Sequence, residues 1–136
     1  MPTAQILLKL SHDLNEGLDH LTEKIVELEK VLIVRGFGVT AEVPLEIPGD
    51  RRRGLVFGKH DNRWAFFLID YDAQGEEERR TLLTGASKRL RVESAARMEA
   101  LLVALREEAI RQTYQVNQAV AKLDSVLALF ASEEGT

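Results

Sequence analysis

Apolar residues recur every three or four positions along two long stretches of the chain, residues 4–34 and residues 87–131. This spacing places them on one side of a helix. Neither stretch contains Pro, and Gly interrupts only the first, at Gly17. The pattern therefore predicts two long amphipathic helices. The seam of the first consists of Leu7, Leu10, Leu14, Leu18, Leu21, Ile25, Leu28 and Leu32, and that of the second of Met98, Leu102, Leu105, Ala109, Val116, Val120, Leu123, Leu127 and Phe130.

The middle of the chain, residues 37–83, has the two-residue period of β-strands. Its first segment alternates apolar and polar residues as far as Ile47, which predicts a strand with one buried face. Pro44 has no N–H group to donate to a neighbouring strand, so we expect this strand at an edge of the sheet.

Two further strands are expected on either side of Asp61 and Asn62, because both residues tolerate the positive φ angles of a tight hairpin turn. Residues 55–60 precede this turn and residues 63–71 follow it. After another turn, residues 78–83 return as a fourth antiparallel strand.

The third of these strands is apolar on both faces, whereas the first is apolar on one. We expect such a strand in the centre of the sheet, covered on both sides. Because helices on one face leave the other face partly open, we also expect an apolar interaction face on this strand. The residues assigned to that face are Trp64, Phe66 and Leu68.

The order of helix, four strands and helix predicts one α+β domain over residues 1–136, with a meander sheet flanked by helices. The two helices can pair antiparallel. The second helix would be roughly 65 Å long, whereas a strand of the sheet spans only about 20 Å. A second copy of the chain would cover the excess in a dimeric helical bundle, so we predict a homodimer or a higher homo-oligomer. The residues expected in this dimer seam are Leu14, Leu21, Leu123, Leu127 and Phe130.

The composition is that of a soluble globular protein, with 45% apolar and 29% charged residues. No apolar run is long enough to cross a bilayer, and the first helix follows without a secretory signal, so we expect a cytoplasmic protein with no membrane partner. The chain contains no Cys, which excludes disulfides, thiolate zinc sites and a Cys nucleophile.

The net charge of −4 conceals an uneven distribution of charge along the chain. Residues 51–97 contain eleven Lys and Arg against seven Asp and Glu, whereas the rest of the chain contains seven against fifteen. A basic middle segment fits an anion-binding face, but it also fits pairing with the acidic helices of another copy. The sequence leaves both alternatives open.

The most unusual charges lie at the start of the second helix, where the helix dipole favours anions and the chain instead has cations. Together with free N–H groups and two hydroxyls, these cations make a candidate anion or phosphate site, and either hydroxyl is a candidate helix cap. The alternative is that the three Glu at residues 76–78, or carboxylates of a partner subunit, neutralise them as surface ion pairs. The candidate residues are Arg79, Arg80, Thr84, Ser87, Lys88, Arg89 and Arg91.

A second basic group, the three Arg at residues 51–53, lies near Trp64 in the sequence. Such a combination can bind single-stranded nucleic acid through phosphate contacts and stacking. Three Arg in a loop are more often a solvated turn, and the acidic net charge argues against DNA binding, so nucleic acid is not the expected partner. The glycine-rich run of a P-loop is missing from the sequence, which gives no indication of nucleotide hydrolysis.

His12, Glu16 and His20 follow one another at steps of four on the first helix and are the metal-binding candidate. A single ion would reach two of them at most, because the three span two helical turns, so we expect neither a metal nor another cofactor. The sequence has no Gly-x-Ser-x-Gly motif to accompany its three His. We therefore expect no catalytic residues and no enzyme.

Small size, acidity, α+β content and a C-terminal amphipathic helix are also features of the small dimeric chaperones of type III secretion, which this profile resembles. Those chaperones have a helix between sheet segments where this chain has only the turn at residues 72–75, and no motif is shared. The sequence thus predicts a non-enzymatic, homo-oligomeric interaction module of adaptor-like or chaperone-like kind, with an unknown protein as a possible further partner. The alternative is an anion-binding or nucleic-acid-binding protein that uses residues 51–53 and 88–91.

Overall fold

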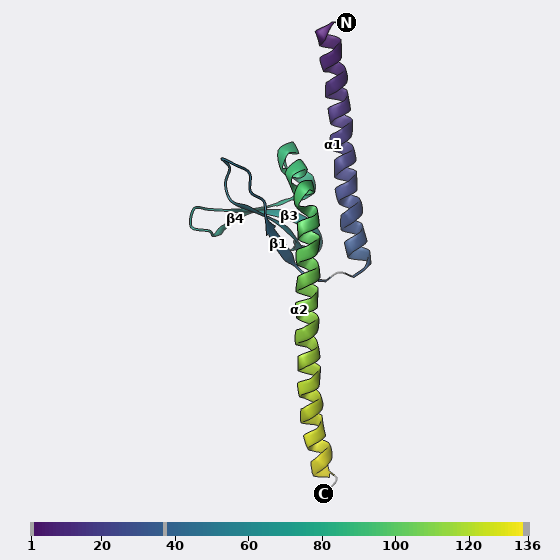
Figure 1. Ribbon diagram of the computed structural model, residues 1–136, viewed down its shortest axis with the longest axis vertical. Coiled ribbons are helices and arrows are strands. Elements are labelled where there is room, and N and C mark those ends of the chain that lie inside the picture. Colours follow the sequence, from purple (N-terminus) through teal and green to yellow (C-terminus); the bar gives the residue numbers. More distant parts are fainter. Residues whose placement is uncertain (1, 37, 135–136) are drawn as a thin grey trace.

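A computed structural model describes residues 2–36 and 38–134 of the chain (Figure 1). Over these residues the chain forms a long helix, four strands, a short 3-10 helix and a second long helix. The two helices flank an antiparallel sheet, so the predicted α+β fold is confirmed. The dimeric bundle is an assembly of two chains, and it stays a prediction.

The first helix, α1, spans Thr3–Val34 and contains 32 residues. Gly36 follows it with a positive φ of 67°, a conformation that ends a helix at little cost for Gly. The predicted helix over residues 4–34 is therefore confirmed. Its apolar seam, however, contains fully buried residues only from the middle of the helix onward. The buried members are Leu18, Ile25 and Leu32.

The four strands form one antiparallel sheet in the order β1-β2-β3-β4. Their bounds are Ala41–Pro44 for β1, Arg53–His60 for β2, Arg63–Tyr71 for β3 and Glu77–Leu82 for β4. The turn between β2 and β3 has φ angles of 50° at Asp61 and 64° at Asn62, as expected for a tight hairpin. β3 occupies a central position, which confirms the prediction from its two apolar faces.

β1 lies at an edge, as Pro44 predicts, but it is shorter than the expected strand. Only Ala41–Pro44 pairs with β2, and Phe37, where the expected strand begins, lies outside the described residues. After Pro44 the chain makes one more backbone hydrogen bond, from the Leu45 N–H to the first residue of β2 at 3.0 Å. Leu45 and Ile47 are buried although they lie beyond the strand. The alternating pattern here reports burial rather than strand pairing.

A 3-10 turn, η1 at Leu83–Gly85, leads into the second helix, α2, which spans Lys88–Glu134 and contains 47 residues. Ser87 Oγ accepts a hydrogen bond from the Leu90 N–H at 3.3 Å. This contact caps the N-terminus of α2, as the sequence predicts.

One face of the sheet packs against both helices and forms the main core. From β2 and β3 this core contains Leu55, Phe57, Phe66 and Leu68, each at most 1% exposed. From the helices it contains Ile25, Leu32, Met98, Leu101 and Leu105. The core therefore uses the second half of α1 and the first half of α2.

The two helices run in the same direction and lie side by side over part of their lengths (Figure 1). Arg91 of α2 donates a hydrogen bond to Thr22 of α1, so α2 begins level with the middle of α1. The antiparallel pairing that the sequence allows does not occur within the chain, because the four strands carry the chain back from the end of α1 to this level before α2 begins. As a result, the first half of α1 and the second half of α2 protrude beyond the sheet in opposite directions.

Candidate functional site

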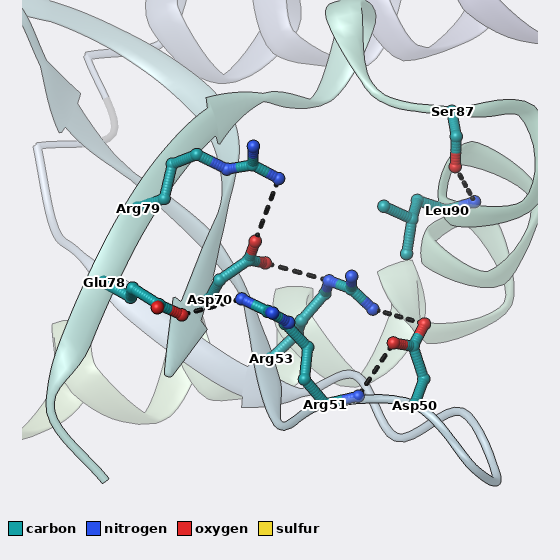
Figure 2. A network of polar contacts seen from close by, with 8 residues as sticks. All are labelled: Asp50, Arg51, Arg53, Asp70, Glu78, Arg79, Ser87 and Leu90. Atoms are coloured by element: carbon teal, nitrogen blue, oxygen red, sulfur yellow. Dashed lines mark hydrogen bonds and ion pairs between the residues drawn. The ribbon is translucent and has the colours of Figure 1, made fainter. Parts of the chain in front are cut away.

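Asp70, near the end of β3, is the centre of a charge network at one end of the sheet (Figure 2). Its carboxylate accepts hydrogen bonds from Arg53 Nε at 2.8 Å and from Arg79 Nη2 at 3.2 Å. Arg53 also donates to Asp50 Oδ2 at 2.6 Å. The Asp70 and Arg53 side chains are only 5% and 11% exposed. The network thus joins the loop before β2 to the three strands β2, β3 and β4, which is a structural use of these charges.

This network was not predicted, because it depends on the register between strands. Arg53 belongs to β2 and lies directly opposite Asp70, whereas the sequence suggests a loop of three equivalent Arg. A signal was present in Asp70 itself, which continues a strand with two apolar faces. A carboxylate at such a position needs a cation or several donors.

The charges around Asp50 interact with one another within the chain. The hydrogen bond from the Arg53 guanidinium, followed by that from the Arg51 N–H at 2.8 Å, lowers the pKa of Asp50 below its ordinary value. The charge of Arg89 on α2 adds to this lowering of the pKa. The Arg51 side chain forms an exposed ion pair with Glu78 at 2.7 Å.

The structure separates the residues expected to bind an anion. Arg79 and Arg80 are neighbours in β4 and project to opposite faces of the sheet. Arg79 bonds Asp70, whereas Arg80 pairs with Glu77 and lies 5.1 Å from the centroid of the Phe67 ring. Their positive charges are therefore used inside the chain. The pair of Arg80 with Glu77 agrees with the neutralising alternative, whereas Arg79 is bonded to a carboxylate that this alternative does not include.

At the start of α2, Ser87 serves as the helix cap and Arg91 donates its hydrogen bond to α1. The Nε atom of Arg91 is buried and has no hydrogen-bond partner among the described residues. Thr84, Lys88 and Arg89 are exposed. What is left of the expected anion site is thus a pair of exposed cations and a hydroxyl beside the first turn of α2.

The expected interaction face lies in the core. Phe66 and Leu68 are each 1% exposed beneath the helices. Trp64 is half-buried and stacks on Phe57, with 5.6 Å between the ring centroids. The helices occupy this face of the sheet, so Phe66 and Leu68 present no open surface, whereas Trp64 is partly exposed. The role of these residues in binding a partner stays a prediction.

The opposite face of the sheet carries a smaller apolar cluster that is also buried, at most 6% exposed, although no helix covers it. Its members are Val56, Phe67 and Ile69. Polar side chains lie across them: Arg80 over Phe67, and Glu42, which accepts a hydrogen bond from the Tyr71 hydroxyl. β3 is therefore covered twice, as predicted, but the second cover consists of side chains.

A hollow of about 500 Å³ lies between the start of β2 and the turn that joins β3 to β4. On its wall the Arg52 guanidinium lies 5.5 Å from the centroid of the Tyr71 ring. Arg51 and Glu78, which pair with each other, form another part of the wall. Within the described chain, Arg52 is the one cation of this hollow that forms no ion pair.

Most of the large apolar side chains that are exposed lie on the two protruding helix halves. On α1 they are Ile6, Leu7, Leu8, Leu10 and Leu14, exposed by 44% to 71%. On α2 they are Ile110, Tyr114, Val116, Val120, Leu123, Val126, Leu127, Leu129 and Phe130, exposed by 42% to 66%. Between residues 112 and 132, α2 has only Lys122 and Asp124 as charged residues. An ordinary solvated helix has more charged residues and fewer exposed apolar side chains than this half of α2.

The protruding halves continue the stripes that are buried beside the sheet. Leu123 lies about five helical turns after Leu105, and so on the same side of α2. Leu7 lies about five turns before Ile25, and so on the same side of α1. We call the uncovered parts the α1 stripe, which is Leu7, Leu10 and Leu14, and the α2 stripe, which is Val116, Val120, Leu123, Leu127 and Phe130. Four of the five residues expected in a dimer seam belong to these stripes, whereas Leu21 is half-buried in the chain's own core.

The metal-binding candidate forms two separate exposed pairs. His12 Nε2 lies 3.3 Å from Glu16 Oε1, and His20 Nδ1 lies 3.7 Å from Glu23 Oε2. Among the described residues, no group of three or more His, Cys, Asp or Glu side chains converges closely enough to hold an ion.

Within residues 2–36 and 38–134, neither helix has a segment with the length and apolarity needed to cross a membrane. Comparisons of the chain with known protein families, curated proteins and solved structures find no match. The function proposed below therefore rests on the chain's own geometry and chemistry.

Proposed function

We propose that the protein is a non-enzymatic interaction module that works as a homo-oligomer, assembled through its protruding helix halves. The observation that carries this proposal is the pair of uncovered stripes. Helices in proteins owe most of their stability to the packing of an apolar face. Side chains such as Leu123 and Phe130, each 62% exposed, lack that packing in a single chain.

The free energy available from covering the stripes is large enough to hold two chains together. Full burial of a large apolar side chain contributes about 1.5–3 kcal/mol, so the exposed part of each stripe residue is worth about 1 kcal/mol. Eight stripe residues in each of two copies then give on the order of 16 kcal/mol. This exceeds most estimates of the cost of association, about 4–15 kcal/mol.

The polar groups support a structural role over a catalytic one. The two carboxylates that the fold brings together, Asp50 and Asp70, both accept hydrogen bonds from Arg53. The hydroxyl at the start of α2, Ser87, is engaged as a helix cap. These groups hold elements in place, and a partner protein is the class of ligand that the uncovered stripes suit.

Size-exclusion chromatography with light scattering tests the proposal at micromolar concentration. The native chain should have at least twice the 15.3 kDa mass of one chain. Leu123→Lys combined with Leu127→Lys should reduce the mass to that of one chain, because two buried ammonium groups would have to lose their hydration. Ser125→Lys, an exposed change on another side of α2, is the matched control and should leave the mass unchanged. A single-chain mass for the native protein would refute the proposal.

A second candidate function, binding of an anion or a nucleic acid, is favoured by exposed cations of the two basic groups that form no ion pair in the described chain, among them Arg52, Lys88 and Arg89. Fluorescence anisotropy with labelled short DNA and RNA tests it. Phosphate binding through these cations should weaken as salt increases and should be lost in a variant with Arg52→Glu and Lys88→Glu. A flat titration at low salt counts against this candidate.

A further inference from the structure

We propose that both stripes are covered by one occupant, a second copy of the chain, through antiparallel exchange of the protruding helix halves. In this arrangement the α1 stripe of each copy packs against the α2 stripe of the other. The proposal rests on the self-association proposed above and specifies its geometry.

The direction of the helices suggests this exchange. α1 and α2 run in the same direction and protrude at opposite ends of the molecule (Figure 1). A two-fold axis perpendicular to the helices reverses the second copy, so its α2 end comes to lie beside the α1 end of the first. The same contact then forms again at the other end of the molecule. The assembly is closed, and both stripes of both copies are covered.

The spacing of the two stripes matches in an antiparallel register that pairs the outermost residues of both stripes. Leu7, Leu10 and Leu14 advance by three and then four residues, and the α2 stripe read backwards from Phe130 advances in the same way. The facing pairs are Leu7 with Phe130, Leu10 with Leu127 and Leu14 with Leu123. In this register Thr3, the first residue of α1, is level with Glu134, the last residue of α2. A shift by seven residues in either direction would leave Leu7 or Phe130 without a partner.

The same register gives Gly17 a role. Gly inside a helix makes the helix less stable than Ala would, and at Gly17 an added Cβ would meet nothing within 4 Å in the single chain. In the exchanged pair Gly17 lies opposite Val120 of the other copy. A residue without a side chain allows the β-branched Val120 to approach α1 closely.

The register also places the two-fold axis. Thr22 of α1 and Arg91 of α2 are joined by a hydrogen bond and therefore lie at about the same height along the helices. Because the helices are parallel, each α1 residue lies at the height of the α2 residue 69 positions later in the sequence. Val34 therefore lies at the height of Val103 in its own chain. The exchange register also places Val34 opposite Val103 of the other copy. The two-fold axis consequently passes through this height. Val34 is 83% exposed and Val103 is 39% exposed. These exposed aliphatic side chains lie at the level where the two copies meet.

The charges along the pair are compatible with antiparallel packing. Helix geometry places Asp13 of one copy and Lys122 of the other on the same edge of the helix pair, less than one turn apart. The apolar area of the stripes is on the order of 500 Å² per copy. A standard interface buries about 800 Å² per partner, and somewhat more than half of that area is apolar. The two apolar areas are therefore similar.

Disulfide trapping in the full chain tests the proposal, and the absence of native Cys makes the readout clear. Leu14→Cys and Leu123→Cys are prepared as separate proteins, mixed, allowed to exchange subunits and oxidised. The exchange predicts a cross-linked heterodimer as the main product of the mixture. Each variant alone should give little cross-link, because the two copies of the same residue lie far apart on opposite sides of the axis. The matched control replaces Leu123→Cys with Leu129→Cys, which is exposed but lies on another side of α2 and should not cross-link to Leu14→Cys.

The alternatives give different results. Strong cross-linking of Leu123→Cys alone would show parallel pairing of the two α2 helices and would overturn the exchange while leaving self-association intact. Equal cross-linking of Leu129→Cys and Leu123→Cys to Leu14→Cys would overturn the register. No cross-link together with a single-chain mass by light scattering would overturn both this inference and the proposed function.

Discussion

The hydroxyl of Thr22 on α1 accepts a hydrogen bond from Nη1 of Arg91 on α2 at 2.6 Å. The same hydroxyl donates to the carbonyl oxygen of Leu18 at 3.1 Å, so it is fully bonded. Arg91 is less well bonded, since its buried Nε has no partner among the described residues. The contact sets the level at which the helices meet, but it leaves a polar atom of Arg91 unsatisfied.

This asymmetry predicts different effects for the two partners. Thr22→Val should lower the free energy of unfolding by about 1–2 kcal/mol, because it leaves Arg91 with a further unsatisfied donor. Arg91→Met should cost less than Thr22→Val, because it removes the unsatisfied group and keeps an apolar stem of similar length. Urea denaturation at one fixed protein concentration measures both changes. A larger loss of stability for Arg91→Met than for Thr22→Val would contradict the assignment of Arg91 Nε as a buried atom without a hydrogen-bond partner.

The Asp70 network predicts a large loss of stability when its central charge is removed. Asp70→Asn leaves Arg53 without one of its two carboxylates in a poorly hydrated site, and should lower the free energy of unfolding by about 3 kcal/mol. Glu78→Gln breaks the exposed pair with Arg51 and should cost less than about 1 kcal/mol. Thermal and urea unfolding compare the two variants. Equal losses would mean that Asp70 is hydrated as freely as Glu78.

Tyr71 predicts a change at high pH. Partial burial, then the hydrogen bond to the Glu42 carboxylate, raises the pKa of Tyr71 from 10.0 to about 12. Because the folded-state pKa is the higher one, the stability from this group is present below pH 10 and is lost as the pH rises from 10 to about 12. Ultraviolet absorbance of tyrosinate measures the pKa, in a Tyr114→Phe background that leaves Tyr71 as the one Tyr.

The control for this titration is Glu42→Gln, which keeps the size of the side chain and removes its charge. It should bring the pKa of Tyr71 back toward 10.0, the ordinary value. An unchanged pKa in this variant would mean that burial alone raises the pKa of Tyr71.

The cap of α2 predicts a local effect of Ser87. Ser87→Ala removes the acceptor of the Leu90 N–H and should lower the free energy of unfolding by about 1 kcal/mol. Ser87→Gly, in which water reaches the freed N–H groups, should cost only a few tenths of a kcal/mol. Circular dichroism during thermal unfolding measures both. Equal losses for the two variants would argue against a capping role for the hydroxyl.

The elements of the fold were predictable because each has a local cause. The seams of α1 and α2, the positive φ angles at Asp61 and Asn62, and the missing N–H of Pro44 all act within a few residues. β1 was predicted too long because Leu45 and Ile47 keep the strand pattern of burial without strand pairing.

The arrangement of the elements depended on contacts between distant residues, which the sequence does not specify. The helices are parallel because the sheet brings the chain back to the middle of α1 before α2 begins. The hydrogen bond between Thr22 and Arg91 shows that α2 begins at this height. The partners of Asp70 follow from the register of three strands. The burial of Phe66 and Leu68 was missed for a related reason: the pattern of β3 shows two apolar faces but does not show which one the helices cover.

Amide hydrogen exchange followed by mass spectrometry over a dilution series tests the central claim most directly. If each protruding half is covered by the other copy, the amides of residues 3–17 and 112–134 are protected in the dimer and lose protection together, at the same concentration. The amides of β2 and β3 should keep their protection in the same samples, because the core lies within one chain. Protection of the two helix halves that is independent of concentration, or that falls in only one of them, would contradict the exchange.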